Sequence, residues 1–478
     1  MSKYYATIGL EMHCEGSETK SKVFSPAKNE YSEIPNENVV AIDMAFPGIL
    51  PVVNKEAVRM SIMMASVLHA RIPEYMYFER KNYYYPDLPK GYQITQNPPE
   101  ECVGNGGYID IEREDGSTFR VEIDNLHLEE DAARSTHLFG KTTLNYNRAG
   151  APLFELVTKP CIHSANDAVA FLEYIRSIYQ YCGISEADAK KGQIRCDVNV
   201  SISEDENTLG TKVEMKNVNS FASVRDAINY EIQRQTELKD AGRYDEVVQE
   251  TRRWDEGTIE TVSMRSKEDA LDYKYFVDPN IPKYKIDKEW VKEIQKSIPE
   301  LPYERRQKYI DELELTPFEA KKLIKSKEIS DYFEECLSLG IKPKEASKWI
   351  SENIVAYLNK NELEISEIYL TPKMLEFILK KLDEGVISSK QAKEVLAKVL
   401  EEEKEPSNFI SKENSQISDP NELGKIIDEI INSNPSQVEQ YRSGKDRVFD
   451  FFVGQVMKNT RGKANPILTK ELLQKKLN

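Results

Sequence analysis

The stretch IRCDVNVSI at residues 194–202 alternates hydrophobic and polar side chains, which is typical of a β-strand with one buried face. Three other stretches alternate in the same way: IGLEMH at residues 8–13, KVEMKN at 212–217 and VEIDNLHLEED at 121–131. Successive side chains of a strand point to opposite faces. Each stretch therefore predicts a strand with one hydrophobic face and one face of ionisable groups.

If these strands lie in one sheet, their ionisable side chains share its open face. The groups in question are carboxylates, a histidine and basic residues: Glu11, His13, Arg195, Asp197, Lys212, Glu214 and Lys216. Oxygen ligands hold Mg²⁺ and cations hold phosphate oxygens, so this mixture favours a site for metal ions and phosphates. For any single strand, a charged face turned to solvent is an equally good interpretation. The agreement of four strands favours the site.

Length and composition indicate a globular protein of several domains. The chain has 478 residues, of which 40% are hydrophobic and 31% are charged, and the length suggests about three domains. It contains no apolar run of about 18 residues, and residues 1–13 lack a secretory apolar stretch. The six cysteines form no CxxC pair, which favours reduced thiols over a zinc or disulfide frame. We expect a cytoplasmic protein without a membrane span.

The charge of the chain is unevenly distributed. The net charge is −16, yet residues 440–478 contain nine basic and three acidic side chains, which leaves −22 for the rest. A basic end on an acidic body is a candidate contact for a polyanion such as a nucleic acid. An ordinary charged surface helix is the alternative.

The pattern of elements predicts an α+β fold with four parts. Strands mix irregularly with helices expected near residues 56–70, 166–181 and 224–241, which argues against a doubly wound sheet. Three later helices are expected to begin at Asx-Pro pairs, where the Asx side chain caps the helix: Asp419, Asn434 and Asn465. The expected parts are a strand-rich cradle domain at 1–286, a helical domain at 287–402, a linker at 403–418 and a C-terminal helical domain at 419–478.

Further motifs, and the absence of others, limit the kinds of reaction that the chain could catalyse. Residues 81–96 read KNYYYPDLPKGYQITQ, a stiff amphipathic segment that begins with Lys81. Residues 127–131 read HLEED, and three adjacent acids resist burial unless cations compensate them. Glu155 lies among hydrophobic residues, where a carboxylate needs a partner. The chain has no GxxxxGK[ST] loop, no dinucleotide-binding fingerprint and no amidase nucleophile motif.

At the level of whole motifs the chain resembles the B subunits of tRNA-dependent amidotransferases, the GatB family. The resemblance runs in collinear order over essentially the whole chain and rests on these segments: IGLEMH, SKVFSP, FPGILPVVN, ERKNYYYPDLPKGYQITQ, HLEED, NRAGAPLFELV, GQIRCDVNVSI, KVEMKNVNSF, QETRRWDE, SMRSKED and FFVGQVMKNTRGKANP.

This resemblance implies an ATP-dependent carbon–nitrogen ligase (EC 6.3.5.-) that uses Mg²⁺. Such subunits act in a heterotrimer with an amidase-type A subunit, which releases ammonia from glutamine, and a small C subunit. They phosphorylate the side-chain carboxylate of Glu-tRNA(Gln), of Asp-tRNA(Asn) or of both, and ammonia then displaces phosphate. The resemblance also implies that the C-terminal domain contacts the tRNA. Which of the two tRNAs is used stays open.

The matching motif positions imply roles for individual residues. The metal ligands would be Glu11, His13, Glu129 and Glu130. The catalytic group would be Lys81, Glu155, Asp197 and Glu214, with Glu155 near the ammonia. The nucleotide would be bound by Lys81, Arg195, Asp197 and Lys216. No zinc is expected, because a cysteine cluster found in some members is missing here.

The chain departs from the family pattern at several positions, among them Arg134, Asn145 and Cys161. These departures leave open a divergent second copy that acts mainly as a tRNA-binding scaffold. Without the resemblance, a metal-dependent phosphohydrolase acting alone would be a third interpretation.

Overall fold

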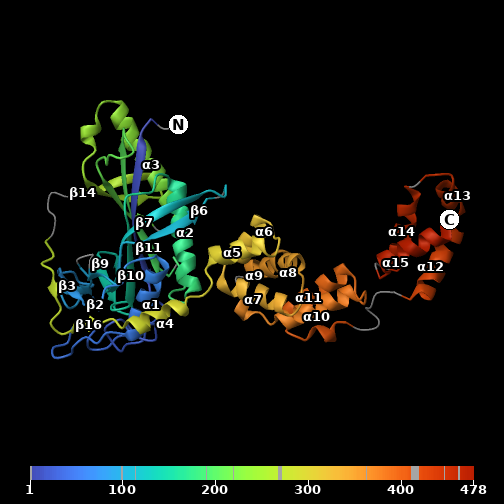
Figure 1. The fold of residues 1–478 in the computed structure, drawn as a ribbon, viewed down its shortest axis with the longest axis horizontal. Coiled ribbons are helices and arrows are strands. Elements are labelled where there is room, and N and C mark those ends of the chain that lie inside the picture. The colour runs from blue at the N-terminus through green and yellow to red at the C-terminus, as the bar shows by residue number, and fades with distance from the viewer. Residues whose placement is uncertain are drawn as a thin grey trace. The chain divides into compact units, whose positions relative to one another are not determined.

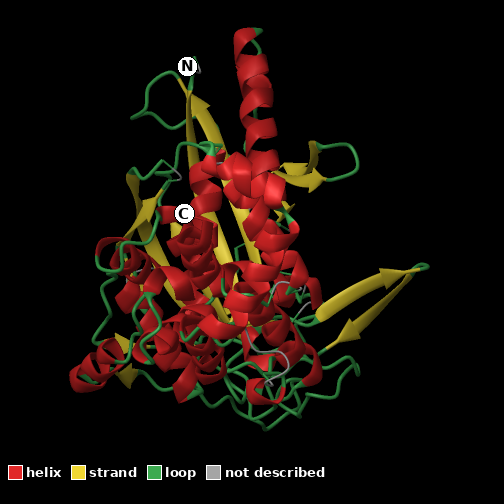
Figure 2. Cartoon of the chain, turned by 90° about the vertical axis from the view of Figure 1, so that its right-hand side faces the viewer, coloured by secondary structure: helices red, strands yellow, loops and turns green. Residues whose placement is uncertain are grey.

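The computed structural model combines a strand-rich part with a helical part. It describes residues 3–97, 101–113, 115–189, 191–218, 220–266, 272–361, 363–410, 419–445, 447–460 and 463–477. These residues belong to two compact units, Met1–Leu301 and Pro302–Asn478. The first unit mixes strands and helices, and the described elements of the second are all helical (Figure 1). Figure 2 shows the chain from another side, with strands in yellow and helices in red. The predicted α+β fold is confirmed.

The first unit is built on a large sheet that contains all four predicted strands. Its path is β14-β13-β12-β11-β1-β10-β7-β5, and β6 pairs with β7 beside it. The strands are β1 Tyr5–Glu15, β5 Gly104–Asn105, β6 Tyr108–Glu112, β7 Thr118–Glu130, β10 Pro152–Thr158, β11 Ile194–Ser203, β12 Val213–Val218, β13 Glu250–Asp255 and β14 Glu260–Ser266. β1 lies in the middle, antiparallel to both β10 and β11. The four stretches that alternate in the sequence therefore lie in one sheet, with β10 between β1 and β7.

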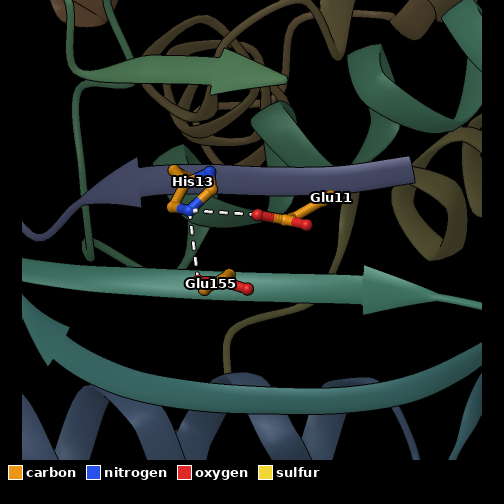
Figure 3. Close-up of side chains that lie close together, drawn as sticks. All are labelled: Glu11, His13 and Glu155. Carbon is orange, nitrogen blue, oxygen red and sulfur yellow. Dashed lines mark hydrogen bonds and ion pairs between the residues drawn. The ribbon is translucent and has the colours of Figure 1, made fainter. Parts of the chain in front are cut away.

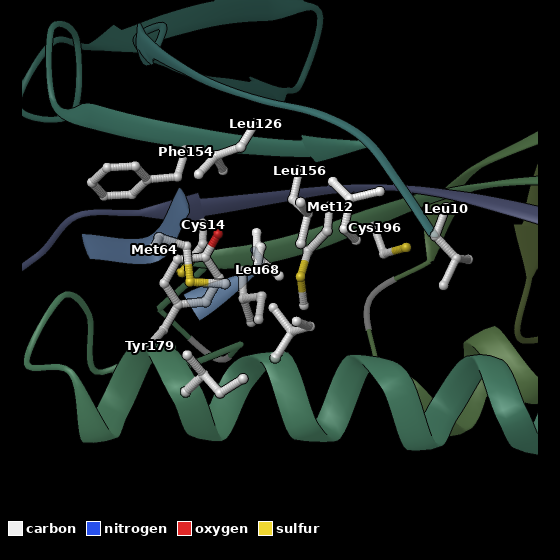
Figure 4. Packing of buried hydrophobic residues seen from close by; sticks show 14 of the residues in the cluster. Leu10, Met12, Cys14, Met64, Leu68, Leu126, Phe154, Leu156, Tyr179 and Cys196 are labelled. Carbon is white, nitrogen blue, oxygen red and sulfur yellow. The ribbon is translucent and has the colours of Figure 1, made fainter. Parts of the chain in front are cut away.

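Three helices cover the hydrophobic face of this sheet. They are α1 (Lys55–Val67), α2 (Ala165–Tyr181) and α3 (Phe221–Asp240), close to the predicted ranges. Each begins after an Asn or Ser whose side chain accepts a helical N–H. Leu10 and Met12 of β1 are almost completely buried and point to the side of the sheet on which a helix runs (Figure 4). Because the helices take this face, the ionisable groups lie on the other.

A small sheet adjoins the large one at β7. It has the order β15-β3-β4, with β3 Glu79–Asn82, β4 Tyr92–Thr95 and β15 Phe276–Val277. Thr95 of β4 donates a hydrogen bond to Glu129 of β7 over 2.9 Å, so β3 and β4 lie beside the ionisable face. Two further pairs complete the strands: β2 Tyr75–Met76 with β16 Tyr284–Lys285, and β8 Arg134–Leu138 with β9 Lys141–Asn145.

The remaining helices follow the strands. They are α4 Lys288–Lys296, α5 Pro302–Asp311, α6 Pro317–Leu323, α7 Lys327–Ser338, α8 Pro343–Trp349, α9 Val355–Asn361, α10 Pro372–Asp383, α11 Ser389–Glu402, α12 Pro420–Ser433, α13 Pro435–Arg442, α14 Val448–Asn459 and α15 Pro466–Leu477. Short helical turns occur at Tyr244–Glu246, Ile350–Ile354, Ile365–Glu367 and Pro406–Asn408. Within the described ranges, no helix combines the length and apolar character that a bilayer span requires.

Two of the three predicted Asx caps are present. Asp419 accepts the N–H of Asn421, and Asn465 accepts the N–H groups of two residues in the first turn of α15. Asn434 differs, because its side chain donates to the carbonyl of Ile430 over 2.8 Å instead. It therefore stabilises the end of α12 and leaves the start of α13 without a side-chain cap.

Residues 287–301 pack differently from the sequence expectation. Ile294 of α4 belongs to the hydrophobic core of the first unit, although the sequence grouped this helix with the helical domain. This amphipathic helix covers apolar side chains of the cradle. The helix-rich composition therefore begins at residue 287, whereas the second compact unit begins at residue 302. The three predicted boundaries between the four parts stay predictions, and residues 411–418 of the predicted linker lie outside the described residues.

Candidate functional site

The centre of the ionisable face is a histidine held between two carboxylates. His13 of β1 lies opposite Glu155 of β10 in the sheet register. Its Nε2 atom is 3.1 Å from Glu155 Oε2 and 3.7 Å from Glu11 Oε1 (Figure 3). Glu11 lies two residues earlier on β1 and therefore on the same face. One atom from each of the three side chains falls within 4.8 Å of the others, a spacing that suits a metal ion.

A second group of the same kind shares Glu155. His127 of β7 lies opposite Glu155 in the register, and its Nε2 is also 3.1 Å from Glu155 Oε2. Glu129, two residues further along β7, places Oε2 3.7 Å from the same nitrogen. His127, Glu129 and Glu155 again offer ligand atoms within 4.8 Å of one another. One carboxylate thus links two imidazoles and two further carboxylates across three strands.

Burial and charge together control protonation in this cluster. Burial alone would raise the pKa of Glu155, but the positive charge and hydrogen bond of His127, and then those of His13, hold it well below the usual range. Burial likewise opposes the charged imidazoles, yet Glu155 raises the pKa of His13 and brings that of His127 well above its ordinary value. Burial and the nearby charge of Glu155 raise the pKa of Glu11. In the absence of a metal ion, Glu155 and the two histidines therefore favour one another's charged forms.

These shifts predict a pH-dependent stability in metal-free buffer. Glu155 contributes fully above its ordinary pKa of 4.5, and His127 contributes fully below its ordinary pKa of 6.5. The contribution of His127 declines as the pH rises above 6.5 and is lost beyond its raised pKa. The free energy of unfolding of His127→Gln should therefore differ most from wild type between about pH 4.5 and 6.5, with the difference shrinking at higher pH. Urea unfolding at several pH values measures it.

The exposed His137 provides the control for this experiment. His137→Gln, on the exposed hairpin, should change the free energy of unfolding only slightly. A His127→Gln difference that stays constant from pH 5 to 9 would contradict the charged pairing.

The adjacent strands β11 and β12 add a second cluster of charges. Asp197 lies opposite Glu11 in the register, and its carboxylate accepts a hydrogen bond from Lys216. The Lys216 amine is also 3.4 Å from Glu214, which accepts a further hydrogen bond from Thr251 over 2.9 Å. Although burial opposes it, the charge of Asp197 raises the pKa of Lys216. This cluster continues the polar face from β1 outward.

Two more cations border the face. Lys81 of β3 is half-buried, and although burial lowers its pKa, the charges of Glu129 and then other acidic groups raise it overall. Burial also opposes the charge of Arg195, but Asp131 and then Glu129 keep its pKa above the usual value. The Arg195 guanidinium is 3.6 Å from Asp131. Lys81, Arg195 and Lys216 could therefore receive phosphate oxygens beside the carboxylates.

Of the predicted metal ligands, Glu130 is the one that the structure does not bring to either group. It follows Leu126 and Leu128 in the period-two pattern of β7 and so has the opposite parity to His127 and Glu129. Its carboxylate pairs with Lys90 over 2.5 Å and accepts the N–H of Ile94 over 2.8 Å. It borders a cavity of about 250 Å³ lined also by Asp43, Asp87, Asp131 and the loop at residues 45–49.

Sequence reasoning missed two residues of the site. His127 was part of the HLEED motif, and its alternation with Glu129 was the signal that places both on one face. Asp131, in the same motif, sits 2.9 Å from Arg148 and 3.6 Å from Arg195. No sequence spacing connects Asp131 to these two arginines, because they come from separate strands and loops.

The departures from the family pattern lie away from these clusters of charge. Asn145, at the end of β9, accepts the N–H groups of Asn36 and Asn147 through its side-chain oxygen. An aspartate would offer the same acceptor, so the turn keeps its hydrogen bonds. Arg134 lies opposite Asn145 on the exposed β8–β9 hairpin, and Cys161 contacts the backbone of Glu122. None of the three departures removes a charge from the polar face.

Comparison with known proteins gives the class of the chain. Residues 6–292 match the GatB/GatE catalytic domain, and residues 331–477 match the GatB domain. A GatB/GatE catalytic domain over the strand-rich unit and a GatB domain over the helices define a class of amidotransferase subunits.

Curated relatives match the chain over almost its full length. They are B subunits of aspartyl/glutamyl-tRNA(Asn/Gln) amidotransferases. The relative from Coxiella burnetii is 45% identical over 98% of this chain and 99% of its own. Those from Limosilactobacillus fermentum and Brevibacillus brevis are 43% and 42% identical over at least 99% of both chains. The chain belongs to the GatB family of tRNA-dependent amidotransferase B subunits.

Proposed function

We propose that this chain is the cytoplasmic, ATP-dependent ligase subunit that amidates Glu-tRNA(Gln), Asp-tRNA(Asn) or both. The observation that carries this proposal is the polar sheet face, where Glu155 links two histidines beside Asp197 and Lys216. Cations next to carboxylates are what phosphoryl transfer to a carboxylate needs, because such a reaction depends on positioning and on charge stabilisation. The full-length match to amidotransferase B subunits supports the same activity.

The donor set fits Mg²⁺. Glu11, Glu129 and Glu155 would supply oxygen ligands, with Glu155 shared between the two groups, and His13 would supply its Nε2 once that nitrogen has lost its proton. One observation favours a cation here: burial and the charge of Glu155 raise the pKa of Glu11, and a bound cation would relieve this repulsion. When bound, Mg²⁺ would neutralise phosphate charge. Glu130 is a candidate only if its pair with Lys90 opens.

The cations would hold the nucleotide and the acyl phosphate. Lys81, Arg195 and Lys216 border the carboxylates and stay charged, so they can bind phosphate oxygens of ATP. Asp197 and Glu214 fix Lys216, because both lie within 3.4 Å of its amine. Glu155 would hold ammonia by accepting a hydrogen bond from its N–H as it reaches the activated carboxylate. Phosphate then leaves, and the amide remains on the tRNA.

The proposal requires partners. The sequence has no amidase nucleophile motif, so glutamine must be hydrolysed by an amidase-type A subunit, with a small C subunit completing the heterotrimer. The test is glutamine-dependent formation of Gln-tRNA from Glu-tRNA, and of Asn-tRNA from Asp-tRNA, by the lone chain and by the reconstituted heterotrimer. We expect activity only from the heterotrimer, and only with ATP and Mg²⁺. Robust amidation by the lone chain, or none by the heterotrimer, would refute the proposal.

Removing the C-terminal region should weaken tRNA binding without weakening ATP binding. Residues 440–478 carry a net charge of +6 on an acidic chain. Deleting residues 419–478 should raise the KM for charged tRNA and flatten its salt dependence, by roughly one unit of slope for each lost phosphate contact. The KM for ATP should change little, because the polar face lies before residue 302. Amidation assays at several salt concentrations measure both.

A matched control replaces acidic residues of the same region, for example Glu439→Gln and Asp450→Asn, which should not weaken tRNA binding. If the truncated chain keeps the wild-type KM and salt slope, the region is a packing element and recognition lies elsewhere in the chain.

A further inference from the structure

Three tyrosines from two distant segments surround Lys81 at the border of the polar face. The Lys81 amine lies 5.0 Å from the ring centre of Tyr273, a cation–π distance. Tyr273 packs edge to face against Tyr83 and Tyr275, with ring centres 5.9 and 6.0 Å apart. We call Tyr83, Tyr273 and Tyr275 the tyrosine wall. One side of this wall holds the lysine that borders the carboxylates.

The backbone fixes the wall in place. Asn82 donates its N–H to the carbonyl of Tyr273 over 2.9 Å, and its side chain donates to the carbonyl of Lys274 over 2.7 Å. Lys274, between the two tyrosines, has a φ of 47°, in the left-handed region that is unfavourable for a lysine. Strained backbone of this kind persists where surrounding contacts impose it, and such positions cluster at functional sites. Here the strain places two aromatic rings beside the same amine.

The wall is close to the carboxylates and still partly open. Burial and the charges of Glu129 and Glu155 raise the pKa of Tyr275, while Lys81 opposes them, so its hydroxyl shares the surroundings of the polar face. The described residues nevertheless leave 39% of Tyr275 exposed. A partly exposed aromatic ring can stack against a flat base, and the neighbouring cation can bind a phosphate that the base carries. The tyrosine wall therefore suits a nucleotide.

We infer that Tyr273 and Tyr275 stack against an adenine ring that enters beside Lys81. This inference rests on the proposed function, which brings two adenines to the site: the base of ATP and the 3′-terminal adenosine of the charged tRNA. Stacking on an aromatic side chain accepts any purine face, so the same wall suits either source. The phosphate or ribose oxygens of the same nucleotide would then lie near Lys81.

The experiment replaces the ring of Tyr275 in the reconstituted heterotrimer. Tyr275→Leu should raise one KM on the order of ten-fold, while Tyr275→Phe, which keeps the ring, should stay close to wild type. A rise in the KM for ATP at saturating tRNA assigns the wall to the nucleotide. A rise in the KM for charged tRNA at saturating ATP assigns it to the terminal adenosine. Tyr84→Leu is the control, because Tyr84 lies in the same segment and is 94% exposed.

The outcomes that overturn the inference are distinct from a failure of the proposed function. If Tyr275→Leu lowers only kcat, or matches Tyr84→Leu in both KM values, the ring merely supports Lys81 or the fold and no base stacks on it. Equilibrium binding of ATP and of charged tRNA to wild type and Tyr275→Leu gives the same comparison without turnover. Unchanged dissociation constants for both ligands would refute stacking, even in a heterotrimer that does not amidate.

Discussion

Glu155→Gln should lower the amidation rate of the heterotrimer on the order of 100- to 1,000-fold while reducing ATP cleavage less. The substitution removes one negative charge 3.1 Å from each of two imidazoles and leaves a side chain of nearly the same shape. The pKa of His13 and of His127 should fall, because Glu155 supplies the charge that raises them. The neutral amide oxygen is also a weaker hydrogen-bond acceptor for the N–H of ammonia than a carboxylate. Rates of Gln-tRNA formation and of phosphate release measure the two steps separately.

The control is Glu122→Gln, which removes a carboxylate that pairs with Lys159 on the exposed surface of the same sheet. It should leave both rates near wild type. If Glu155→Gln reduced amidation and ATP cleavage by the same factor, Glu155 would act on phosphoryl transfer, and its role with ammonia would be wrong.

Asp197→Ala should nearly stop ATP cleavage, with a loss on the order of 100-fold or more. Asp197 accepts a hydrogen bond from Lys216 and faces Glu11 across the β1–β11 pair, so it connects the cations to the carboxylate cluster. Without it, the Lys216 amine retains only the 3.4 Å contact with Glu214 among the described ion pairs, and its pKa should fall. Single-turnover ATP cleavage in the presence of charged tRNA measures the effect.

Asp110→Ala serves as the comparison, since Asp110 forms an exposed ion pair with Arg120 on β6 and β7. A thermal melt of both variants separates lost chemistry from lost folding. Wild-type ATP cleavage by a folded Asp197→Ala variant, at limiting Mg²⁺, would remove Asp197 from the phosphoryl-transfer group.

Much of the cradle could be predicted because the alternation of side chains along a strand shows which of its faces is buried. The alternation of Leu10 and Met12 with Glu11 and His13 was sufficient to divide the buried face from the ionisable one. The three helices were likewise visible from their spacing. The sequence also contained the motifs that resemble GatB subunits, and the similarity to known amidotransferase B subunits over almost the full length confirms that the chain belongs to this family.

Pairing across the sheet could not be predicted in the same way. Register decides which residues face each other, and the chain gives no local signal that Glu155 lies opposite both His13 and His127. The same limit explains why Glu130 was expected among the metal ligands. Its place beside Glu129 in HLEED suggested a shared site, but adjacent residues of a strand point to opposite faces. The tyrosine wall joins positions about 190 residues apart, which no short motif connects.

The central place of β1 has a consequence for synthesis of the chain on the ribosome. β1 ends at residue 15, but its two neighbours, β10 and β11, begin at residues 152 and 194. At about 5 to 20 residues per second, β1 waits on the order of 10 to 40 seconds before both edges can pair. During that time an apolar strand with at least one open edge is available for wrong pairing, and of the three helices that cover the sheet only α1 is translated before β10. Chaperone binding to nascent chains shorter than about 200 residues should therefore be strong, and it should fall once β11 has emerged.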